Sequence, residues 1–479
     1  MAAYLPGETV ANLIHNMKNI CNQLFLIILI GLPAIACCQQ CSCEKKFAFI
    51  KRQIETNYAG FSDKVNPSTQ KDYDKITREY SIKAKHIKND ALCIYTLQNW
   101  VNFFKDGHIH LNGIDANKKK EIIKLTSVQI KQLEQSSKKV EGIYYSFDSS
   151  FKIAVLKNKT DFRDYAGVII SSEYQEWKEG QVKLELKKID DSSFTAITYE
   201  KNHFYYPELY RFDGISLGAG NWVKSGEKDN EAMNKAAKKA ELKGLAAKKL
   251  SDSTLYIQIG SFSITKAKAI DSLFKANESL LRTTPNLILD VRYNGGGDDG
   301  SYKPIQPWLY TNPVISVGDD VYATEDNIRI YKQRLTDPGY SESDKAEMKA
   351  LITTMEHNIG KFVLFSPDDT ITFDKVEPYP KKVIILINKG CGSSTEQFLL
   401  DITPSAKVTL MGTHTYGGLD YSNVIEAESP CGNIQFGYAS TRSHRIVIGK
   451  SIDNIGIKPD IEVAEDKDLV AEALKLLER

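Results

Sequence analysis

The stretch KKVIILINKGCGSSTEQF, residues 381–398, joins an apolar run to a helix-forming segment through a turn with two glycines. The uninterrupted apolar run at residues 383–387 predicts a strand that is buried on both faces. Ser393 stands where a helix is expected to begin, and Glu396 three residues later completes the pattern of a capping box. The alternative is a sharp strand-to-helix turn that exposes the hydroxyl of Ser393 as a nucleophile. The local residues by themselves favour the cap.

Strands and helices alternate around this stretch from residue 253 onward. The segments TLYIQIGSF, NLILDV and AKVTLMG predict strands, and TKAKAIDSLFKANESLL predicts an amphipathic helix. Continuous apolar strands separated by helices favour an α/β core with a largely buried sheet over residues 253–479. Residues 318–375 are expected to form a helical insertion between two strands of this core.

The residues before this core show other patterns. Apolar residues recur at helical spacing among charges over residues 45–135, which predicts an N-terminal helical segment. Short runs of alternating apolar and charged residues over residues 136–220, as in GQVKLELKKI, predict an antiparallel β module. The Lys- and Ala-rich residues 221–252 are expected to form a helical connector. A chain of 479 residues is long enough for such a division.

The N-terminus has the features of an export signal. Residues 24–36 read LFLIILIGLPAIA, an uncharged apolar run that is too short to cross a bilayer comfortably. The small residues just before Cys37 resemble the lipobox of bacterial lipoproteins, which implies a signal peptide at residues 1–36, a lipidated Cys37 and a tether at residues 37–44. Plain secretion with cleavage nearby and a short membrane anchor are the alternatives. We therefore expect an exported protein that is lipid-anchored in the cell envelope, at the outer membrane or on the periplasmic face.

Composition excludes several classes of function. Lys and Arg number 62 against 61 Asp and Glu, so the formal net charge of +1 gives no basic excess for nucleic acid. Five of the eight cysteines fall in the signal and the tether, which leaves Cys93, Cys391 and Cys431 in the folded part. Three widely spaced cysteines predict neither a disulfide framework nor a zinc site, and no cofactor or metal is expected.

A second glycine-rich turn follows another buried strand, in LILDVRYNGGGDDG at residues 287–300. The three consecutive glycines allow positive φ angles and let backbone N–H groups converge on an external oxygen. The spacing matches neither a dinucleotide-binding fingerprint nor a P-loop. Asp298 and Asp299 follow the glycines, but no third ligand at suitable spacing supports a metal site, so a solvated loop is the preferred interpretation.

Three motifs in one order resemble those of a known enzyme family. LDVRYNGGG closes one strand, VIILINKGCGSSTE forms the later turn, and NIGIKPDIEV follows at residues 454–463. This order is similar to that of the C-terminal-processing/tricorn-core family of serine peptidases, the tail-specific protease superfamily. The resemblance covers about residues 253–465 and reaches the helical segment through KDGHIHL at residues 105–111. It implies a crotonase-like (ClpP/crotonase) α/β core, and with it Ser393 becomes the expected nucleophile.

The sequence also distinguishes two catalytic arrangements of that family. The Ser–Lys branch carries a lysine 25 positions after the nucleophile, where this chain has Gly418. The tricorn-like branch takes a histidine from the N-terminal region and an acid that stands directly before an N-x-G sequence. By resemblance these residues are His108 as the base and Asp453 as the acid, with His110 as the alternative base.

Two departures from the tricorn-like pattern bear on this assignment. Gly107 stands where that branch has a serine that bridges toward the acid, and Asp453 is shorter than the glutamate usual there. In addition, the acidic residue that selects basic substrates in tricorn-like cores has no evident equivalent around residues 314–316. A preference for basic residues is therefore not carried over.

The residue types in these motifs meet the needs of acyl transfer. A serine hydroxyl needs a base in hydrogen-bond reach, a histidine takes and returns the proton, and a carboxylate holds the imidazole and stabilises the imidazolium. The resemblance implies that the backbone N–H groups of Gly297 and Ser394 bind the oxyanion, where such a donor contributes about 2.7–4 kcal/mol at the transition state.

The expected function is that of an envelope-anchored serine endopeptidase or processing peptidase. It would hydrolyse peptide bonds in peptides or partly unfolded proteins through an acyl-enzyme, and the membrane would be its partner through the lipid anchor. Two alternatives stay open: a catalytically silent crotonase-like binding protein, and a non-peptidase ester hydrolase.

Overall fold

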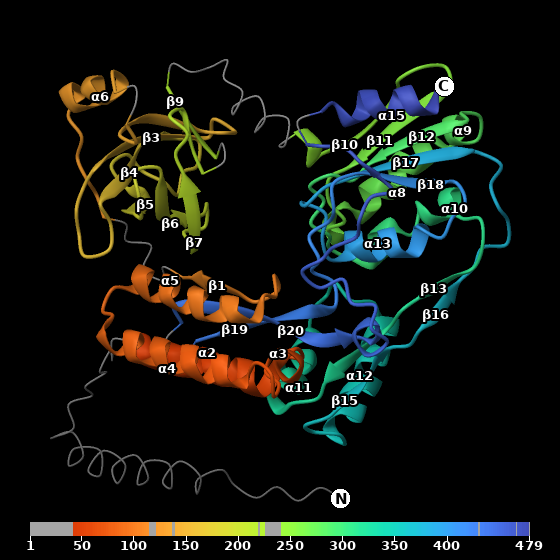
Figure 1. Cartoon of the computed structure of the whole chain (residues 1–479), viewed down its shortest axis with the longest axis horizontal. Helices are drawn as coiled ribbons and strands as arrows, with labels where there is room; N and C mark the ends of the chain where they lie inside the picture. Colours follow the sequence, from red (N-terminus) through yellow and green to blue (C-terminus); the bar gives the residue numbers. More distant parts are fainter. Residues whose placement is uncertain are drawn as a thin grey trace, which may run out of the picture. The chain divides into compact units, whose positions relative to one another are not determined.

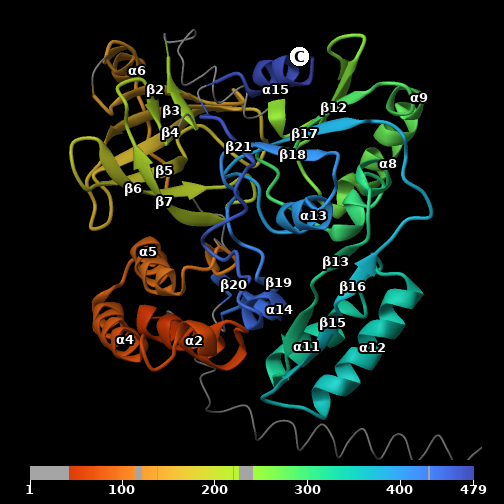
Figure 2. The same ribbon diagram turned by 45° about the vertical axis from the view of Figure 1, so that its right-hand side comes forward.

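The computed structural model describes residues 42–114, 121–136, 139–218, 221–225, 241–429, 432–465 and 467–478. Figure 1 shows its ribbon, and Figure 2 shows the same ribbon turned by 45°. The chain from Ser42 onward forms one compact unit. The predicted signal peptide at residues 1–36 and Cys37 lie outside the described residues. Within the described ranges, no helix has the length and apolarity needed to cross a membrane.

A six-stranded sheet forms the core of the C-terminal half. Its strands, in spatial order, are β10 (Leu245–Lys249), β11 (Thr254–Ile259), β12 (Asn286–Asp290), β17 (Lys382–Ile387), β18 (Val408–Gly412) and β21 (Ile461–Glu462). β10 runs antiparallel to β11, and every other pair of neighbours is parallel. The predicted apolar strands form β11, β12, β17 and β18, which lie next to one another as a buried parallel sheet requires.

Helices cover both faces of this sheet. α8 (Ala267–Ala276) and α13 (Ser394–Ile402) pack on one face, and α15 (Leu469–Leu477) packs on the other (Figure 1). Along β12, Leu287 and Leu289 join the first cluster and Ile288 joins the second, which explains why the strand is apolar at successive positions. Each such side chain contributes about 1.5–3 kcal/mol through its burial. The α/β arrangement predicted for this region is present.

A larger antiparallel sheet connects the N-terminal half to the C-terminal strands. Its path runs β15-β14-β20-β1-β7-β6-β5-β4-β3-β2-β9-β8, with β19 paired to β20. The strands are β1 (His110–Gly113), β2 (Gly142–Ser146), β3 (Phe151–Lys157), β4 (Tyr165–Ser172), β5 (Val182–Lys188), β6 (Ser193–Tyr199), β7 (Tyr205–Arg211), β8 (Ser216–Leu217), β9 (Trp222–Lys224), β14 (Asp319–Tyr322), β15 (Phe362–Ser366), β19 (Tyr421–Glu428) and β20 (Ile434–Ser443). Strands β2 to β8 fall within residues 136–220, where alternating runs predicted antiparallel pairing.

The N-terminal segment is mainly helical. It comprises α2 (Cys43–Asn57), α3 (Phe61–Lys64), α4 (Gln70–His86), α5 (Asp90–Val101), the 3₁₀ helix η1 (Asn102–Phe104) and α6 (Ser127–Glu134). In α2, Phe47, Ile50 and Ile54 recur at helical spacing and are buried in one apolar cluster with Trp100 of α5. The same cluster includes side chains of β20, so these helices pack against the C-terminal strands.

A disulfide joins Cys43 to Cys93, with 5.6 Å between the two Cα atoms. The expectation that the cysteines form no such link is wrong for this pair. Cys43 was assigned to a tether at residues 37–44, whereas it is the first residue of α2, and Ser42 Oγ caps that helix by accepting Lys45 N at 3.3 Å. The position of a cysteine along the chain therefore does not predict whether the fold brings a second cysteine beside it.

Two further predictions are corrected in part. In the connector at residues 221–252, the described residues include the strands β9 and β10, and β10 pairs along its length with β11. The rest of the predicted helical connector, residues 226–240, lies outside the described residues. Lys and Ala favour a helix, but pairing at the sheet edge overrides that weak propensity. The insertion at residues 318–375 contains the helices α11 (Glu325–Arg334) and α12 (Glu342–Glu356) but also β14, β15 and β16 (Asp369–Ile371), so it is helical only in part.

The strand pairing positions the segments that carry the predicted motifs. β12 and β17 are parallel neighbours, with Asp290 opposite Leu386, so the turns that follow them meet at one edge of the core sheet. β1 pairs with β20, with His110 opposite Gly437. The remaining short elements are α9 (Glu278–Leu281), α10 (Gln306–Leu309), α14 (His444–Val447), η2 (Ile264–Lys266), η3 (Asp299–Tyr302) and β13 (Val314–Ser316).

Candidate active site

Ser393 occupies a strained turn between β17 and α13. Its φ and ψ angles are 53° and −127°, a combination that costs a non-glycine residue about 1–3 kcal/mol. Its side chain makes no capping hydrogen bond to α13. The capping interpretation is therefore wrong, and the backbone has the geometry that presents a hydroxyl at a sharp strand-to-helix turn.

Glu396 also differs from the capping-box expectation. Its buried carboxylate accepts hydrogen bonds from Thr415 Oγ1 at 2.5 Å, from Gly417 N at 2.7 Å and from Gly418 N at 2.9 Å. These bonds tie the first turn of α13 to the loop after β18. Gly418, where the Ser–Lys branch has its lysine, serves here as a backbone donor.

The three-glycine turn after β12 packs directly against Ser393. Gly392 N donates a hydrogen bond to Asn294 O at 3.2 Å. Gly296 has a φ of 99°, and a Cβ atom there would lie 2.8 Å from Ser394 N and 2.9 Å from Ser393 Cβ. The buried Asn294 holds the turn, since its Oδ1 accepts Gly296 N at 3.0 Å. The close approach of two turns therefore requires glycine at position 296.

A cavity of about 490 Å³ opens beside Ser393. Four residues that the sequence predicted line it: Ser393, Ser394, Gly297 and His108. Its walls also include residues of η3, β13, β14, β15, α13, β19, β20 and α14. The fold thus brings the expected nucleophile, base and oxyanion donors to one site from segments that lie far apart in the chain.

His108 precedes β1, whereas His110 is the first residue of that strand. His108 lines the cavity, and its buried Nδ1 has no hydrogen-bond partner among the described residues. His110 Nε2 lies 2.8 Å from a carboxylate oxygen of Glu426, and this hydrogen bond raises the pKa of His110. The geometry therefore favours His108 over His110 as the base.

Gly107 is explained by its neighbour Tyr416. A Cβ atom at position 107 would overlap the ring of Tyr416, which is 54% exposed. The serine that the tricorn-like pattern places before the histidine therefore has no room while Tyr416 keeps this position. The sequence showed the departure, and the structure supplies its steric reason.

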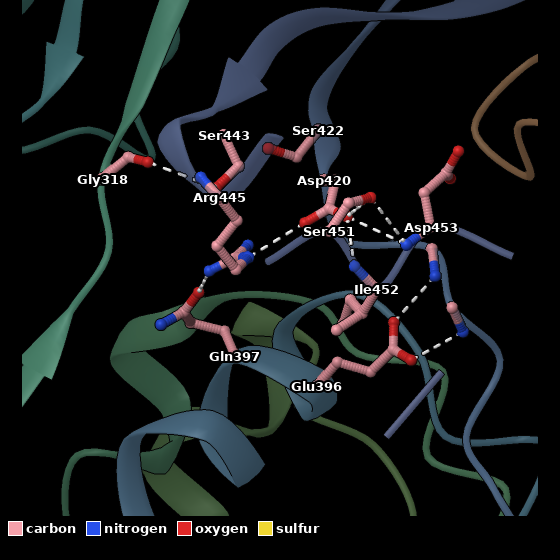
Figure 3. Close-up of polar contacts among 12 residues, drawn as sticks. Gly318, Glu396, Gln397, Asp420, Ser422, Ser443, Arg445, Ser451, Ile452 and Asp453 are labelled. Carbon is pink, nitrogen blue, oxygen red and sulfur yellow. Dashed lines mark hydrogen bonds and ion pairs between the residues drawn. The ribbon is translucent and has the colours of Figure 1, made fainter. Parts of the chain in front are cut away.

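The Asp453 carboxylate makes no hydrogen bond or ion pair with His108 in the described part of the chain. It pairs with Lys64 Nζ and accepts a hydrogen bond from Asn454 Nδ2 at 3.0 Å. Burial raises the pKa of Asp453, and the hydrogen bond and charge of Lys64 lower it. In Figure 3 its side chain points away from the other residues drawn. Of the three residues predicted to form a triad, the structure brings Ser393 and His108 to the cavity and leaves Asp453 outside its lining.

A buried ion pair that the sequence analysis did not find supports the cavity wall. Arg445 Nε donates to Asp420 Oδ1 at 2.9 Å, and Arg445 Nη1 donates to Gln397 Oε1 at 3.2 Å (Figure 3). Asp420 Oδ2 also accepts the N–H groups of Ile452 and Asp453, at 2.7 and 2.9 Å. No sequence motif predicts this hydrogen-bond network, because its residues come from separate segments that only the fold brings together.

Three carboxylates line the cavity without being part of the predicted site, those of Asp298, Asp299 and Asp319. Burial raises the pKa of Asp299, and burial raises the pKa of Asp319 to about 6. The positive charge of Arg445, which lines the same cavity, lowers the pKa of Asp299 and of Asp319. Across the described ranges, no group of three His, Cys, Asp or Glu residues is arranged to hold a metal ion.

Comparison with known proteins finds a family model that matches the region of this site. Residues 253–463 match the model of peptidase family S41, which agrees with the region of the predicted resemblance. A comparison with curated protein sequences finds no match.

Solved structures show remote likenesses over most of the chain. Mature CPAF is similar at 12% identity and a TM-score of 0.46, with 89% of this chain and 92% of that chain covered. The photosystem II D1 C-terminal processing protease is similar at 11% identity and a TM-score of 0.39, with 91% and 98% covered. A lipoprotein from Streptococcus agalactiae is similar at 12% identity and a TM-score of 0.37, with 94% and 99% covered.

Proposed function

We propose that this chain, of which residues 253–463 match peptidase family S41, is a serine peptidase that hydrolyses peptide bonds with Ser393 as nucleophile and His108 as general base. The observation that carries this proposal is the strained backbone of Ser393 in a cavity that His108 also lines. A residue stays in a strained conformation only where its surroundings impose it, and such residues gather at active sites.

In the first half of the reaction, His108 takes the hydroxyl proton of Ser393 while Oγ attacks the carbonyl carbon of the peptide. The C–N bond then breaks, His108 gives the proton to the leaving amine, and an acyl ester remains on Ser393. In the second half, water attacks the ester, its proton passes through His108 to Ser393 Oγ, and the carboxylic acid is released.

The oxyanion of each tetrahedral intermediate requires donors that are already in place. The N–H of Ser394 belongs to the first turn of α13, where backbone amides have no partner within the helix and the helix dipole is positive. Gly297 is held by a bridge to Phe262, and it lines the same cavity as Ser394. This pairing of a turn amide with a helix amide supports their role as the oxyanion donors.

The substrates are peptides or proteins, as the family implies. A cavity of about 490 Å³ lies within the size range of sites that bind small ligands. We infer that it accepts a short stretch of extended chain, from a peptide or a partly unfolded protein, since a folded domain does not enter a space of that size. A crotonase-like core also belongs to this proposal, and the mostly parallel sheet with helices on both faces supports it.

We also propose that the protein is exported and lipid-anchored at Cys37. The apolar run before Cys37 supports this, and so does the disulfide between Cys43 and Cys93, because disulfides persist mainly in oxidising compartments. Growth of expressing cells with an alkyne-tagged fatty acid tests the anchor. We expect label on the wild type and on Cys38→Ser and none on Cys37→Ser; equal labelling of all three would contradict the anchor.

Labelling of the full-length protein with a fluorophosphonate probe tests the nucleophile and the base together. We expect the wild type to be labelled, and labelling to be lost in Ser393→Ala and in His108→Ala. Ser272→Ala, which changes an exposed serine on α8, is the matched control and should be labelled like the wild type. A wild type that stays unlabelled although it shows a cooperative unfolding transition would contradict the proposal and favour a silent binding protein. Hydrolysis of a peptide library by the wild type that has not been exposed to the probe then separates a peptidase from an ester hydrolase.

A further inference from the structure

We propose that Asp106 is the carboxylate that orients His108 and stabilises its protonated form during the reaction. The proposal rests on the assignment of His108 as the base, and it puts Asp106 in the place that the family resemblance suggested for Asp453. Asp106 stands two residues before His108 and acts through it, so it is a positioning residue.

Two hydrogen bonds fix the Asp106 carboxylate beside His108. Oδ1 accepts the backbone N–H of His108 at 2.8 Å, and the same oxygen lies 3.8 Å from His108 Nδ1. Oδ2 accepts a hydrogen bond from Tyr58 Oη at 2.7 Å. Tyr58 is itself buried and follows α2, so the carboxylate is held from the helical segment as well as from its own turn.

The charge of Asp106 has no permanent counter-charge among the described residues. Its side chain is 2% exposed, and His108 is the only basic side chain paired with it in the described part of the chain. A buried anion without a partner is unfavourable, so Asp106 gains its compensating charge only when His108 is protonated. That is the state that the base reaches in each half of the reaction.

The two ring nitrogens of His108 can serve different partners, Nδ1 for Asp106 and Nε2 for Ser393. Nδ1 is buried, lies 3.8 Å from Asp106 Oδ1 and makes no hydrogen bond to any described residue. Nε2 is then left for the hydroxyl of Ser393. A shift of about 1 Å brings Nδ1 within hydrogen-bonding distance of Oδ1, and catalytic hydrogen bonds are often long before the substrate binds.

Asp453 differs from Asp106 in having a permanent counter-charge, although the charge of Asp106 acts on it. Lys64 pairs with the Asp453 carboxylate, so that charge is already compensated. Burial first, and then the charge of Asp106, raise the pKa of Asp453. Of these two neighbouring carboxylates, one is therefore paired with a lysine and the other is left for the histidine.

The other titratable groups near Asp106 are tyrosines. Burial, followed by the charge of Asp106, raises the pKa of Tyr58 and of Tyr416, and Asp106 adds to the rise at Tyr421. A tyrosine whose pKa is raised above its ordinary value of about 10 stays neutral over the pH range in which a histidine acts as a base. These groups therefore do not obscure the effect of Asp106 on a pH profile.

A purely structural role is the competing explanation. An aspartate that accepts the N–H of the residue two positions later closes a turn. Asp213 closes the same kind of turn with Ile215 N at 2.9 Å, and it does not line the cavity. A turn needs only an acceptor oxygen, which asparagine also has. Exchanging aspartate for asparagine therefore removes the charge and keeps the turn.

The test compares Asp106→Asn, Asp453→Asn and Asp213→Asn in the full-length protein. The readouts are hydrolysis of p-nitrophenyl butyrate across pH and the rate of labelling by a fluorophosphonate. For Asp106→Asn we expect kcat to fall about 10²–10⁴-fold with KM within about threefold, as when the acid of a serine–histidine–acid triad is made neutral. The acid limb of its remaining kcat/KM profile should move to lower pH, because the imidazolium has lost its anionic partner. Asp453→Asn should stay within about tenfold of the wild type, and Asp213→Asn within about twofold.

Two further variants keep the test decisive. Asp106→Glu restores a carboxylate and should recover at least about tenfold over Asp106→Asn. Tyr58→Phe removes one hydrogen bond to Asp106 and should lower kcat about 3–10-fold, in line with the net contribution of a typical hydrogen bond. If Asp106→Asn does not fold, full activity in Tyr58→Phe with an unchanged acid limb of its pH profile would overturn the proposal.

The remaining outcomes also decide the question. A steep loss in Asp453→Asn with Asp106→Asn within tenfold of the wild type would return the role to Asp453. An unchanged acid limb in Asp106→Asn, with activity lowered equally at all pH values, would assign Asp106 to structure alone. A folded wild type that neither hydrolyses the ester nor reacts with the probe would contradict the proposed function itself, and the role of Asp106 with it.

Discussion

The two sides of the candidate active site are built in different ways. Ser393 and the glycine turn follow β17 and β12, which are parallel neighbours in one sheet, so a single element pair positions the nucleophile and the oxyanion donors. His108 comes from the turn before β1, and β1 pairs with β20 in the other sheet. The base therefore depends on how the N-terminal helices and β1 dock against C-terminal strands.

This difference predicts which kinds of substitution should lower activity on each side of the site. The nucleophile side is crowded and strained, so it should respond to the addition of single atoms to its backbone turns. The base side is held by tertiary contacts and by a disulfide between two helices, so it should respond to changes that loosen docking. The predictions below test this contrast, from the largest expected effect to the smallest.

On the nucleophile side, Gly296→Ala should lower kcat/KM about 10²–10³-fold, the effect of losing an oxyanion donor. A Cβ atom there would approach Ser393 Cβ at 2.9 Å in a residue whose φ is 99°. The matched control is Gly295→Ala, because a Cβ atom at position 295 meets nothing within 4 Å. Steady-state kinetics on the ester and a thermal unfolding curve check the result; equal losses in both variants would contradict the steric explanation.

On the base side, Gly107→Ser should lower kcat about 3–30-fold, because the added Cβ atom overlaps the ring of Tyr416. The loss is expected to be moderate because Tyr416 is half exposed and its ring can move. Kinetics of Gly107→Ser combined with Tyr416→Ala provide the check, since removing the ring should restore most of the activity. A double variant as slow as the single one would show that the glycine is required for its backbone and not for the space that it leaves.

The disulfide offers a second way to loosen the base side. Replacing Cys43 and Cys93 by serine should lower the free energy of unfolding by about 2–4 kcal/mol, since the bond closes a loop with a separation of 50 residues. Activity at 25 °C should stay within about twofold, because neither cysteine lines the cavity. Thermal unfolding with and without dithiothreitol measures this. The reductant should lower the Tm of the wild type and leave that of the double variant unchanged, and a shift in both would point to another cause.

The smallest expected effect is a pH-dependent change in folding stability that comes from Asp401 on α13. The Asp401 carboxylate accepts hydrogen bonds from Tyr302, Gln397 and Ser316. Burial raises the pKa of Asp401 to about 6 in the folded state, against about 3.9 for an unfolded chain. The folded state thus holds the proton more tightly, so this stabilisation is complete below pH 4 and is lost as the pH rises through 6. The lost stabilisation amounts to no more than about 3 kcal/mol.

Urea unfolding of the wild type and Asp401→Asn at pH 4.5 and pH 7 checks this sign. The wild type should lose more stability than the variant between the two pH values. An equal change in both proteins would mean that Asp401 titrates in the folded state as it does in an unfolded chain.

Prediction from the sequence succeeded where the deciding residues are neighbours in the chain. The apolar runs that became β11, β12 and β17 were recognisable because a strand buried on both faces is apolar at successive positions. The glycine turn after β12 was recognisable because a close approach of two backbones excludes side chains. The family match over residues 253–463 covers this same region.

Prediction failed where the partner of a residue is distant in the chain. Ser393 and Glu396 have the spacing of a capping box, but Glu396 instead binds the loop after β18, and only the backbone angles of Ser393 reveal its strain. Cys43 found its partner on α5, and β10 became a strand because β11 offered a free edge.

By itself, the sequence determined the mostly parallel core, the two glycine turns and the serine that stands between a strand and a helix, because periodicity and glycine placement act over a few residues. Only the tertiary structure decided which histidine lines the cavity and which carboxylate accompanies it. His110 is engaged by Glu426 and Asp453 by Lys64, which leaves His108 and Asp106 facing each other. Charges pair across space, so the choice among equivalent residue types is settled by the neighbours that folding provides.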